Sequence, residues 1–308
     1  MNAQVVVLAG GTGGAKLARG VLDVVGAANL TVIANTGDDI LLHGLHISPD
    51  PDLITYWLAD RIDQERGWGF ATETFAALAQ LKQYGSDDAW FQLGDRDLAT
   101  HLVRTNLLRA GARLTDAAAS IARGLGVDAR VLPMSDDPVT TYVRTDGRWR
   151  HFQEYMIKDG ARQIPETYEF RGAQQASPTP EVLAALATAE IVLIGPSNPI
   201  ASIGPILAVP CMRGALQEAP APVVAISPLV DGRPLKGPTD KFMAAASLEL
   251  SHGGVAAAYD GLIDGIVCDS TAAQPASIPS HTIDTSMHDS QSRKRVSSEA
   301  LNFASSRH

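Results

Sequence analysis

The chain has 308 residues, of which 45% are hydrophobic and 19% charged, a composition typical of a globular protein with one large or two modest domains. The formal net charge of −9 disfavours a general nucleic-acid or membrane-surface binder, so an anionic ligand needs local positive groups or a metal ion. The two cysteines, Cys211 and Cys268, form no C-x-x-C pair and imply neither a disulfide framework nor a zinc site.

The N-terminal sequence predicts a buried strand over 5–9, a glycine-rich turn and an amphipathic helix. Backbone N–H groups and the helix dipole favour an anion at such a helix N-terminus, so we expect phosphate to bind there. The candidate residues are Gly10, Gly11, Thr12, Gly13, Gly14 and Lys16. The dinucleotide fingerprint fails because Lys16 replaces its third glycine, and the P-loop pattern fails because Leu17 stands where Ser or Thr is needed.

A second buried strand is predicted over 30–34, and Asn35, Asp38 and Asp39 follow it. Ligands of open α/β sheets lie at the carboxyl ends of strands, so we expect these residues beside the glycine turn. Asp38 and Asp39 are candidate Mg²⁺ ligands, and helix capping or a solvated loop is the other interpretation.

The proline-rich loop that comes next carries two further candidate carboxylates, Asp50 and Asp52. Each either caps the following helix or points at a ligand hydroxyl or a metal ion. His43 and His46 precede this loop, and we interpret them as a surface pair.

Aromatic residues are frequent over 60–95, and Trp68 lies between two glycines, where its ring could stack on a flat ligand. Arg96 is predicted on the turn before a helix that Asp97 caps and that runs to Arg109. The Arg96 guanidinium either grips a phosphate or carboxylate or forms an internal Asp–Arg ion pair.

A hairpin with strands over 140–145 and 150–157 is predicted around Asp146 and Gly147, a strong type I′ turn signal. Further buried strands are predicted at 191–194, 223–226 and 265–269. Two X-Pro bonds stiffen the loop after the first of these, so Ser197, Asn198 and Ser202 are candidate contacts for a base or ribose.

These elements predict a Rossmann-like, doubly wound and mostly parallel α/β sheet with an inserted or appended smaller helical and hairpin region. We expect one domain over 1–308, an insertion over 60–170 that covers the active site, and a partly ordered tail over 270–308. A strand at 281–283 and a helix over 293–303 are expected in that tail. No apolar run reaches the ~18 residues of a membrane span, and a strand that starts at residue 5 leaves no room for a signal peptide, so we expect a cytoplasmic protein.

Several motifs, in this order along the chain, resemble those of the CofD/FbiA family of coenzyme F-420 biosynthesis. They are AGGTGGAK at 9–16, NTGDD at 35–39, SPDPD at 48–52, LGDRD at 93–97, MSDDP at 134–138, HFQEY at 151–155 and GPSNPIASIGP at 195–205. The resemblance covers about 5–303. The chain departs from the family's usual pattern between Cys268 and Asp284, where it is shorter and less acidic, which leaves the pairing of the last strand open.

The resemblance implies an Mg²⁺-dependent transferase. Its substrates would be the deazaflavin FO and a guanosine diphosphate-linked three-carbon acid, either lactate, enolpyruvate or glycerate. A ribityl hydroxyl of FO attacks the phosphorus nearer the acid, and GMP leaves. By this resemblance Asp38 or Asp39 holds Mg²⁺, Asp50 or Asp52 orients or deprotonates the hydroxyl, and Arg96 grips FO or the acid phosphate.

Two rival interpretations have different sequence requirements. A non-catalytic nucleotide-binding regulator of the gluconeogenesis-factor type shares the Gly-Gly-Thr-Gly turn but does not need the motifs at 48–52, 93–97 and 134–138 together. A nicotinamide dehydrogenase needs the third glycine that is missing here. Homodimerisation is the expected assembly.

Overall fold

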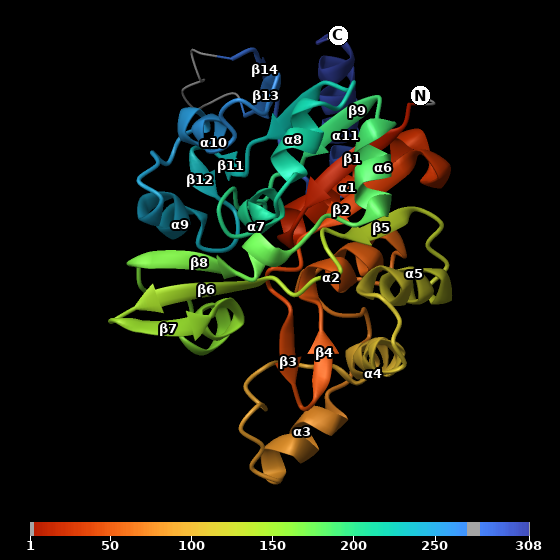
Figure 1. The fold of residues 1–308 in the computed structure, drawn as a ribbon, viewed down its shortest axis with the longest axis vertical. Helices are drawn as coiled ribbons and strands as arrows, with labels where there is room; N and C mark the ends of the chain where they lie inside the picture. Colours follow the sequence, from red (N-terminus) through yellow and green to blue (C-terminus); the bar gives the residue numbers. More distant parts are fainter. Residues whose placement is uncertain (1–2, 270–277, 308) are drawn as a thin grey trace.

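The computed structural model describes residues 3–269 and 278–307, and its centre is a seven-stranded sheet (Figure 1). Every pairing within this sheet is parallel. In spatial order the strands are β14 (Ser280–Thr282), β13 (Gly265–Cys268), β10 (Val223–Ile226), β9 (Ile191–Ile194), β1 (Val5–Ala9), β2 (Leu30–Ala34) and β5 (Arg130–Pro133). The predicted doubly wound α/β fold is confirmed.

Helices cover both faces of the sheet because its central strands are apolar on both sides. Val5, Val7 and Ala9 of β1 point into a core built with α1 (Gly11–Val25), α2 (Pro49–Leu58) and α11 (Ser290–Ser305). Val6 and Leu8 point into the opposite core, which contains α6 (Pro180–Ala187), α7 (Gly204–Ala208), α8 (Met212–Gln217) and α10 (His252–Ala258). The period of two along the strand therefore separates the two cores.

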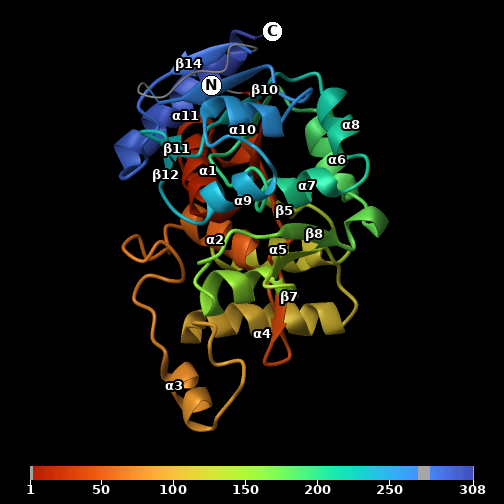
Figure 2. The same cartoon turned by 90° about the vertical axis from the view of Figure 1, so that its left-hand side faces the viewer.

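Smaller elements lie at one end of this sheet (Figures 1 and 2), and α3 extends farthest from it. They are the hairpin of β3 (Ile40–Leu42) and β4 (Leu45–Ile47), the helices α3 (Ala76–Gln83), α4 (Asp95–Arg109) and α5 (Leu114–Gly124), and the antiparallel sheet of β6 (Thr140–Thr145), β7 (Arg148–His151) and β8 (Thr167–Arg171). The short elements η1 (Ala27–Asn29), η2 (Glu154–Lys158), η3 (Ala173–Gln175), β11 (Leu229–Val230), β12 (Arg233–Pro234) and α9 (Thr239–Ala245) complete the described part. Strand β5 falls inside the range 60–170 yet pairs with β2 in the main sheet, and the division into domains stays a prediction.

Two local predictions are wrong. Helix α4 begins at Asp95 rather than after Asp97, because the Glu73 carboxylate accepts from the backbone N–H groups of Arg96 and Asp97 and replaces a local cap. The hairpin's second strand ends at His151 instead of continuing to 157, and the chain continues into η2. The type I′ turn is confirmed, since Asp146 and Gly147 have φ values of 51° and 68°.

The C-terminal segment contributes to the central fold. Strand β14 pairs in parallel with β13, which settles the pairing that the sequence left open. Helix α11 packs beside α1, and the two elements overlap the strand and helix expected there. Residues 270–277 of the predicted tail lie outside the described residues. Within the described ranges, no helix is long and apolar enough to cross a membrane.

Candidate active site

The strand order changes direction between β1 and β9, and a polar cavity lies at this point. From β1 the chain adds β2 and β5 on one side, then crosses to β9 and adds the remaining strands on the other. Segments that leave neighbouring strands in opposite directions open a crevice at the carboxyl edge, where open α/β sheets bind ligands. A cavity of about 640 Å³ occupies this place.

The polar cavity collects candidate residues that are distant in sequence. The turn after β1 supplies Gly10, Gly11, Thr12, Gly13 and Lys16, and the loop after β9 supplies Ser197, Asn198 and Ser202. Asp38 and Asp50 complete the set of predicted residues that line it. The structure therefore brings together the predicted anion site, the stiff loop and two of the candidate carboxylates.

The glycines allow the start of α1 to approach the β9 loop closely. A Cβ on Gly13 would lie 2.0 Å from the carbonyl oxygen of Pro196, so no larger residue fits without displacement of the backbone. Gly14, which does not line the cavity, packs against Ser197. Gly11 and Gly13 fall within the helix rather than in a preceding loop, because α1 begins one residue after Gly10.

Some polar groups of the loop after β9 form hydrogen bonds that support the loop itself. The Ser197 hydroxyl accepts from the backbone N–H of Gly10 at 3.3 Å. The Asn198 side-chain oxygen accepts from the N–H groups of Ile200 and Ala201, both at 3.0 Å. These bonds hold the loop against the glycine turn and fix the shape of the crevice.

Asp38 and Asp50 converge on Asn35 in the interior of the crevice. The Asn35 amide donates to Asp38 at 3.1 Å and to Asp50 at 2.9 Å, and the backbone N–H of Gly11 donates to Asp50 at 2.8 Å. Burial, followed by the charge of Asp50, raises the pKa of Asp38 well above its usual value. Burial likewise raises the pKa of Asp50 to about 6, although the hydrogen bonds from Asn35 and Gly11 act to lower it.

Within this carboxylate pair, Asp38 fits a divalent cation. In the described part of the chain no group of three His, Cys, Asp or Glu side chains is arranged to hold a metal ion. Mg²⁺ does not require one, since it commonly uses one or two protein carboxylates together with water and substrate phosphates. A buried carboxyl whose pKa is raised by a neighbouring carboxylate, as that of Asp38 is by Asp50, is a donor that a cation would stabilise.

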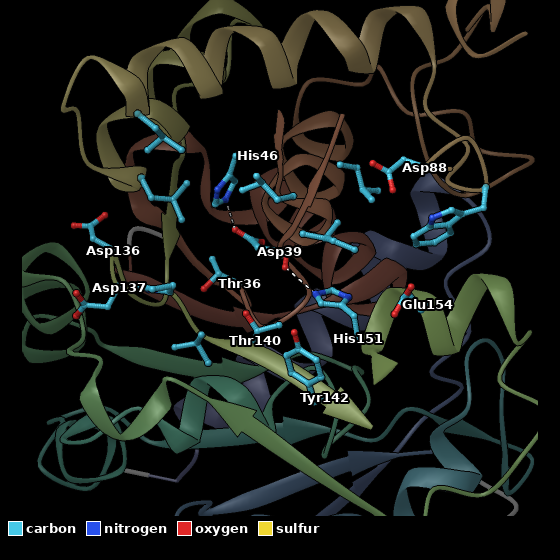
Figure 3. A pocket seen from close by; sticks show the side chains of 18 residues that line it. Thr36, Asp39, His46, Asp88, Asp136, Asp137, Thr140, Tyr142, His151 and Glu154 are labelled. Atoms are coloured by element: carbon cyan, nitrogen blue, oxygen red, sulfur yellow. Dashed lines mark hydrogen bonds and ion pairs between the residues drawn. The ribbon is translucent and has the colours of Figure 1, made fainter. Parts of the chain in front are cut away.

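Asp39 points into a different cavity, of about 690 Å³ (Figure 3). Its carboxylate accepts from the Ser48 hydroxyl at 2.8 Å and bonds the His46 ring at 2.8 Å, and its carbonyl bonds the His151 ring at 3.0 Å. Asp38 and Asp39 thus line separate cavities. His46 is held by Asp39, which differs from the expected surface pair with His43.

The other acids of this cavity also have partners. Asp136 accepts from the hydroxyl and N–H of Thr115, and Glu154 pairs with Lys158 at 2.9 Å. The carboxylates that line this cavity are therefore largely used to hold the β3–β4 hairpin, α5 and η2 in place.

A third cavity, of about 400 Å³, adjoins the polar one and is mostly apolar. It shares Asp50, Gln153 and Ile157 with the polar cavity. The rest of its wall is Ile47, Pro49, Asp52, Leu53, Tyr56, Trp68, Gly69, Phe91, Gln92, Asp97 and His101. We call it the aromatic cavity. Asp50 therefore lies at the junction of a polar and an aromatic compartment.

Asp52 is neutralised inside the protein. Both of its carboxylate oxygens accept from Arg104, one of them at 3.0 Å, and the Arg104 side chain is only 1% exposed. Burial raises the pKa of Asp52 while the charge of Arg104 opposes the rise. Burial, then the charge of Arg104, lowers the pKa of His101 beside them, so that ring is neutral. Asp50 and Asp52 both lie in the first turn of α2, which begins at Pro49, rather than in the predicted loop before the helix. Among the described residues, only Asp50 of the two has no cationic side chain within ion-pair distance.

Trp68 and Arg96 have different surroundings. Trp68 lines the aromatic cavity, with the Arg66 guanidinium 5.2 Å from its ring centre and Phe75 at its edge. Arg96 is exposed on the first turn of α4 and lines none of the three cavities. Within the described ranges its side chain forms no ion pair, so the alternative of an internal Asp–Arg pair is not found, and the predicted grip on a ligand stays a prediction without support from the three cavities.

The sequence reasoning missed Lys236 and Gln153, which also line the polar cavity. The KGPT sequence at 236–239 resembles an ordinary helix start, and only the fold brings it opposite Lys16. Burial and then the charge of Lys236 lower the pKa of Lys16. Neither lysine has a carboxylate within ion-pair distance among the described residues, so both are available to an anion.

Comparison with known proteins assigns the family. The family model for "2-phospho-L-lactate transferase CofD" matches residues 5–304. A phosphoenolpyruvate transferase of Kitasatospora aureofaciens is 44% identical over 98% of both chains. A 2-phospho-L-lactate transferase of Methanosarcina mazei is 42% identical over 86% of both chains.

Solved structures agree on the fold. A member of the UPF0052 family from Bacillus halodurans superposes with a TM-score of 0.63 at 16% identity, covering 98% of this chain and 99% of that one. At this identity the likeness concerns the fold alone. The family model and the curated relatives span nearly the whole length, and the chain belongs to the CofD family.

Proposed function

We propose that this chain is a CofD-type transferase of coenzyme F-420 biosynthesis that moves a phospho-acid from a guanosine diphosphate-linked donor to the deazaflavin FO. Family membership supports the transferase class. The observation that carries the specific reaction is the pair of adjoining cavities, one polar and one aromatic, with Asp50 at their junction. A transfer between two bound substrates needs this arrangement, because the reacting atoms must meet in line.

The donor fits the polar cavity. Its diphosphate would lie at the N-terminus of α1, where backbone N–H groups and the Lys16 and Lys236 side chains offset its charge. The loop at 196–202 would hold the guanine and ribose. Asp38 would hold Mg²⁺, which supplies charge neutralisation for the phosphate oxygens when bound, and Asp50 would be left to act on the acceptor hydroxyl.

The acceptor fits the aromatic cavity. FO has a flat, largely apolar ring system, and Trp68, Phe91 and Tyr56 offer aromatic surface for it. A ring bound there directs its ribityl chain toward Asp50. The terminal hydroxyl of the ribityl chain then lies next to the donor phosphates.

In the reaction, the terminal hydroxyl oxygen of FO forms a bond to the phosphorus nearer the three-carbon acid. The bond from that phosphorus to the bridging oxygen of GMP breaks, and GMP leaves with the bonding electrons. Asp50 accepts the hydroxyl proton, for which a carboxyl with a pKa of about 6 is suited near neutral pH. Catalysis is mainly positioning and charge neutralisation, with no covalent enzyme intermediate.

The first test measures FO binding by quenching of its fluorescence, with and without GDP and Mg²⁺, for the wild type and Asp50→Ala. We expect saturable FO binding to the wild type, and GMP release with one of the lactyl, enolpyruvyl or glyceryl donors. Asp50→Ala should lose at least about a hundredfold in turnover, the lower range for loss of a general base. Asp87→Asn, an exposed aspartate on the α3 side, is the matched control.

The opposite result has a clear meaning. If GDP binds while FO does not bind at high micromolar concentration, the transferase proposal fails. A nucleotide-binding regulator then becomes the better description of the site.

A further inference from the structure

We propose that Asp97 recognises the polar edge of the acceptor ring and makes the aromatic cavity selective for a flat heterocycle that carries an imide N–H group. This inference rests on the proposed function, because it concerns the acceptor bound in that cavity. It assigns a ligand contact to a residue that the sequence suggested only as a helix cap.

Asp97 is fixed in the wall of the aromatic cavity. It is the third residue of α4, is 8% exposed and lines the cavity one helical turn from His101. The Glu73 carboxylate accepts from its backbone N–H at 3.3 Å, so the helix start holds the residue in place.

The opposite wall leaves room beside the carboxylate. A Cβ on Gly69 would lie 3.4 Å from the Asp97 Oδ2 atom, and Gly69 has a φ of +68°, where glycine is favoured. The Trp68–Gly69 segment thus passes close to this oxygen without covering it with a side chain. Trp68 and Asp97 line the same cavity, so a flat ring bound in it can present an edge to Asp97.

Within the described part of the chain, Asp97 is a buried carboxyl of this cavity with two hydrogen-bonding partners and no cation beside it. Asp52 is bonded through both oxygens to Arg104, and Asp50 accepts from Gly11 and Asn35. Asp97 has no Lys, Arg or His within ion-pair distance among the described residues, and it bonds the hydroxyl of Tyr56 and a backbone group of its own turn. A buried carboxyl with spare hydrogen-bonding capacity gains a partner when a ligand binds.

The chemistry of the ring edge matches both protonation states of this group. Burial, then the charges of Asp52 and Glu73, raise the pKa of Asp97 to about 7, so the charged and neutral forms coexist near neutral pH. A deazaflavin pyrimidine edge carries an N–H between two carbonyls. The carboxylate accepts from the N–H, and the neutral acid donates to a carbonyl.

The experiment measures Kd for FO and for an FO derivative methylated on the imide nitrogen, by fluorescence quenching. The proteins are the wild type, Asp97→Leu and Asp97→Asn, with Asp87→Asn as the exposed control. We expect the wild type and the control to bind FO at least tenfold more tightly than the methylated ring. Asp97→Leu should lose tenfold or more in FO affinity and bind both rings alike, while Asp97→Asn, whose amide oxygen still accepts from the N–H, keeps most of the discrimination.

GDP binding to every variant gives the folding check, since Asp97 does not line the polar cavity. If the wild type binds FO but Asp97→Leu retains the preference for the unmethylated ring, this inference is overturned and the proposed function stands. If the wild type fails to bind FO at all, the proposed function fails and the inference fails with it.

Discussion

At the scale of single residues, burial and partners decide which acid can act. Asp50 and Asp52 are two positions apart and both buried, but only Asp52 has a guanidinium beside it. The ion pair is structural: it links α2 to α4 beneath the aromatic cavity. Asp50 lies at the junction of the two cavities and is not neutralised by a cationic side chain of the described residues, so it can accept a proton from a bound ligand.

The Asp52–Arg104 pair predicts a strong effect on stability. Arg104→Met leaves the buried Asp52 carboxylate without its guanidinium partner, so we expect the free energy of unfolding to fall by about 3–5 kcal/mol. Urea denaturation measures this. The double variant Asp52→Leu/Arg104→Met removes both charges and should recover most of the loss. An Arg104→Met protein as stable as the wild type would contradict the assignment.

Asp97 predicts a pH dependence of stability. Its pKa of about 7 in the folded protein lies above the usual value of 3.8, so the folded state binds the proton more tightly than the unfolded state. Its contribution to stability is therefore greatest at acidic pH and is lost as pH rises toward and through about 7.

Urea denaturation of the wild type and Asp97→Asn at about pH 5 and about pH 8 tests this sign. The stability of Asp97→Asn relative to the wild type should increase by a few kcal/mol from the lower to the higher pH. A difference that does not change with pH would show that Asp97 titrates normally.

At the scale of elements, the start of α1 and the loop after β9 form one unit. The helix begins at Gly11, and its third residue, Gly13, touches the Pro196 carbonyl of that loop. Close backbone approach at this contact keeps the helix N-terminus directed into the crevice.

This contact predicts that Gly13→Ala destabilises the protein by about 1–3 kcal/mol, the usual cost of an overpacked contact. GDP affinity should fall in the same variant, because the loop and the helix start must separate. Thermal unfolding and GDP titration measure the two effects. Gly124→Ala is the matched control: a Cβ there meets no atom within 4 Å, and alanine in a helix should leave stability unchanged or raise it by up to about 1 kcal/mol. Equal behaviour of the two variants would argue against the contact.

At the scale of the whole molecule, the sheet order creates the polar cavity and the smaller elements create the aromatic one. The crevice between β1 and β9 follows from the crossing of the chain after β5. Helix α2, the segment around Trp68, helix α4 and η2 then enclose the adjoining space. One compartment is thus a property of the sheet, and the other is added by the segments between its strands.

The parallel α/β fold, the glycine turn and the family resemblance could all be predicted from the amino-acid sequence, because they depend on local patterns. Short apolar runs such as 5–9 and 191–194 favour buried strands, and a turn of four glycines favours a close backbone approach or a ligand site. The sequence also placed Asp38 beside the glycine turn, since the carboxyl ends of parallel strands share one edge.

Only the tertiary structure decided how the acids divide their roles. Adjacent residues such as Asp38 and Asp39 can face opposite cavities, and sequence spacing in a loop does not fix that choice. The pairing of Asp52 with Arg104 joins residues 52 positions apart, and Lys236 reaches the site from the far end of the chain. Such contacts depend on packing between distant elements, so they cannot be predicted from local sequence patterns.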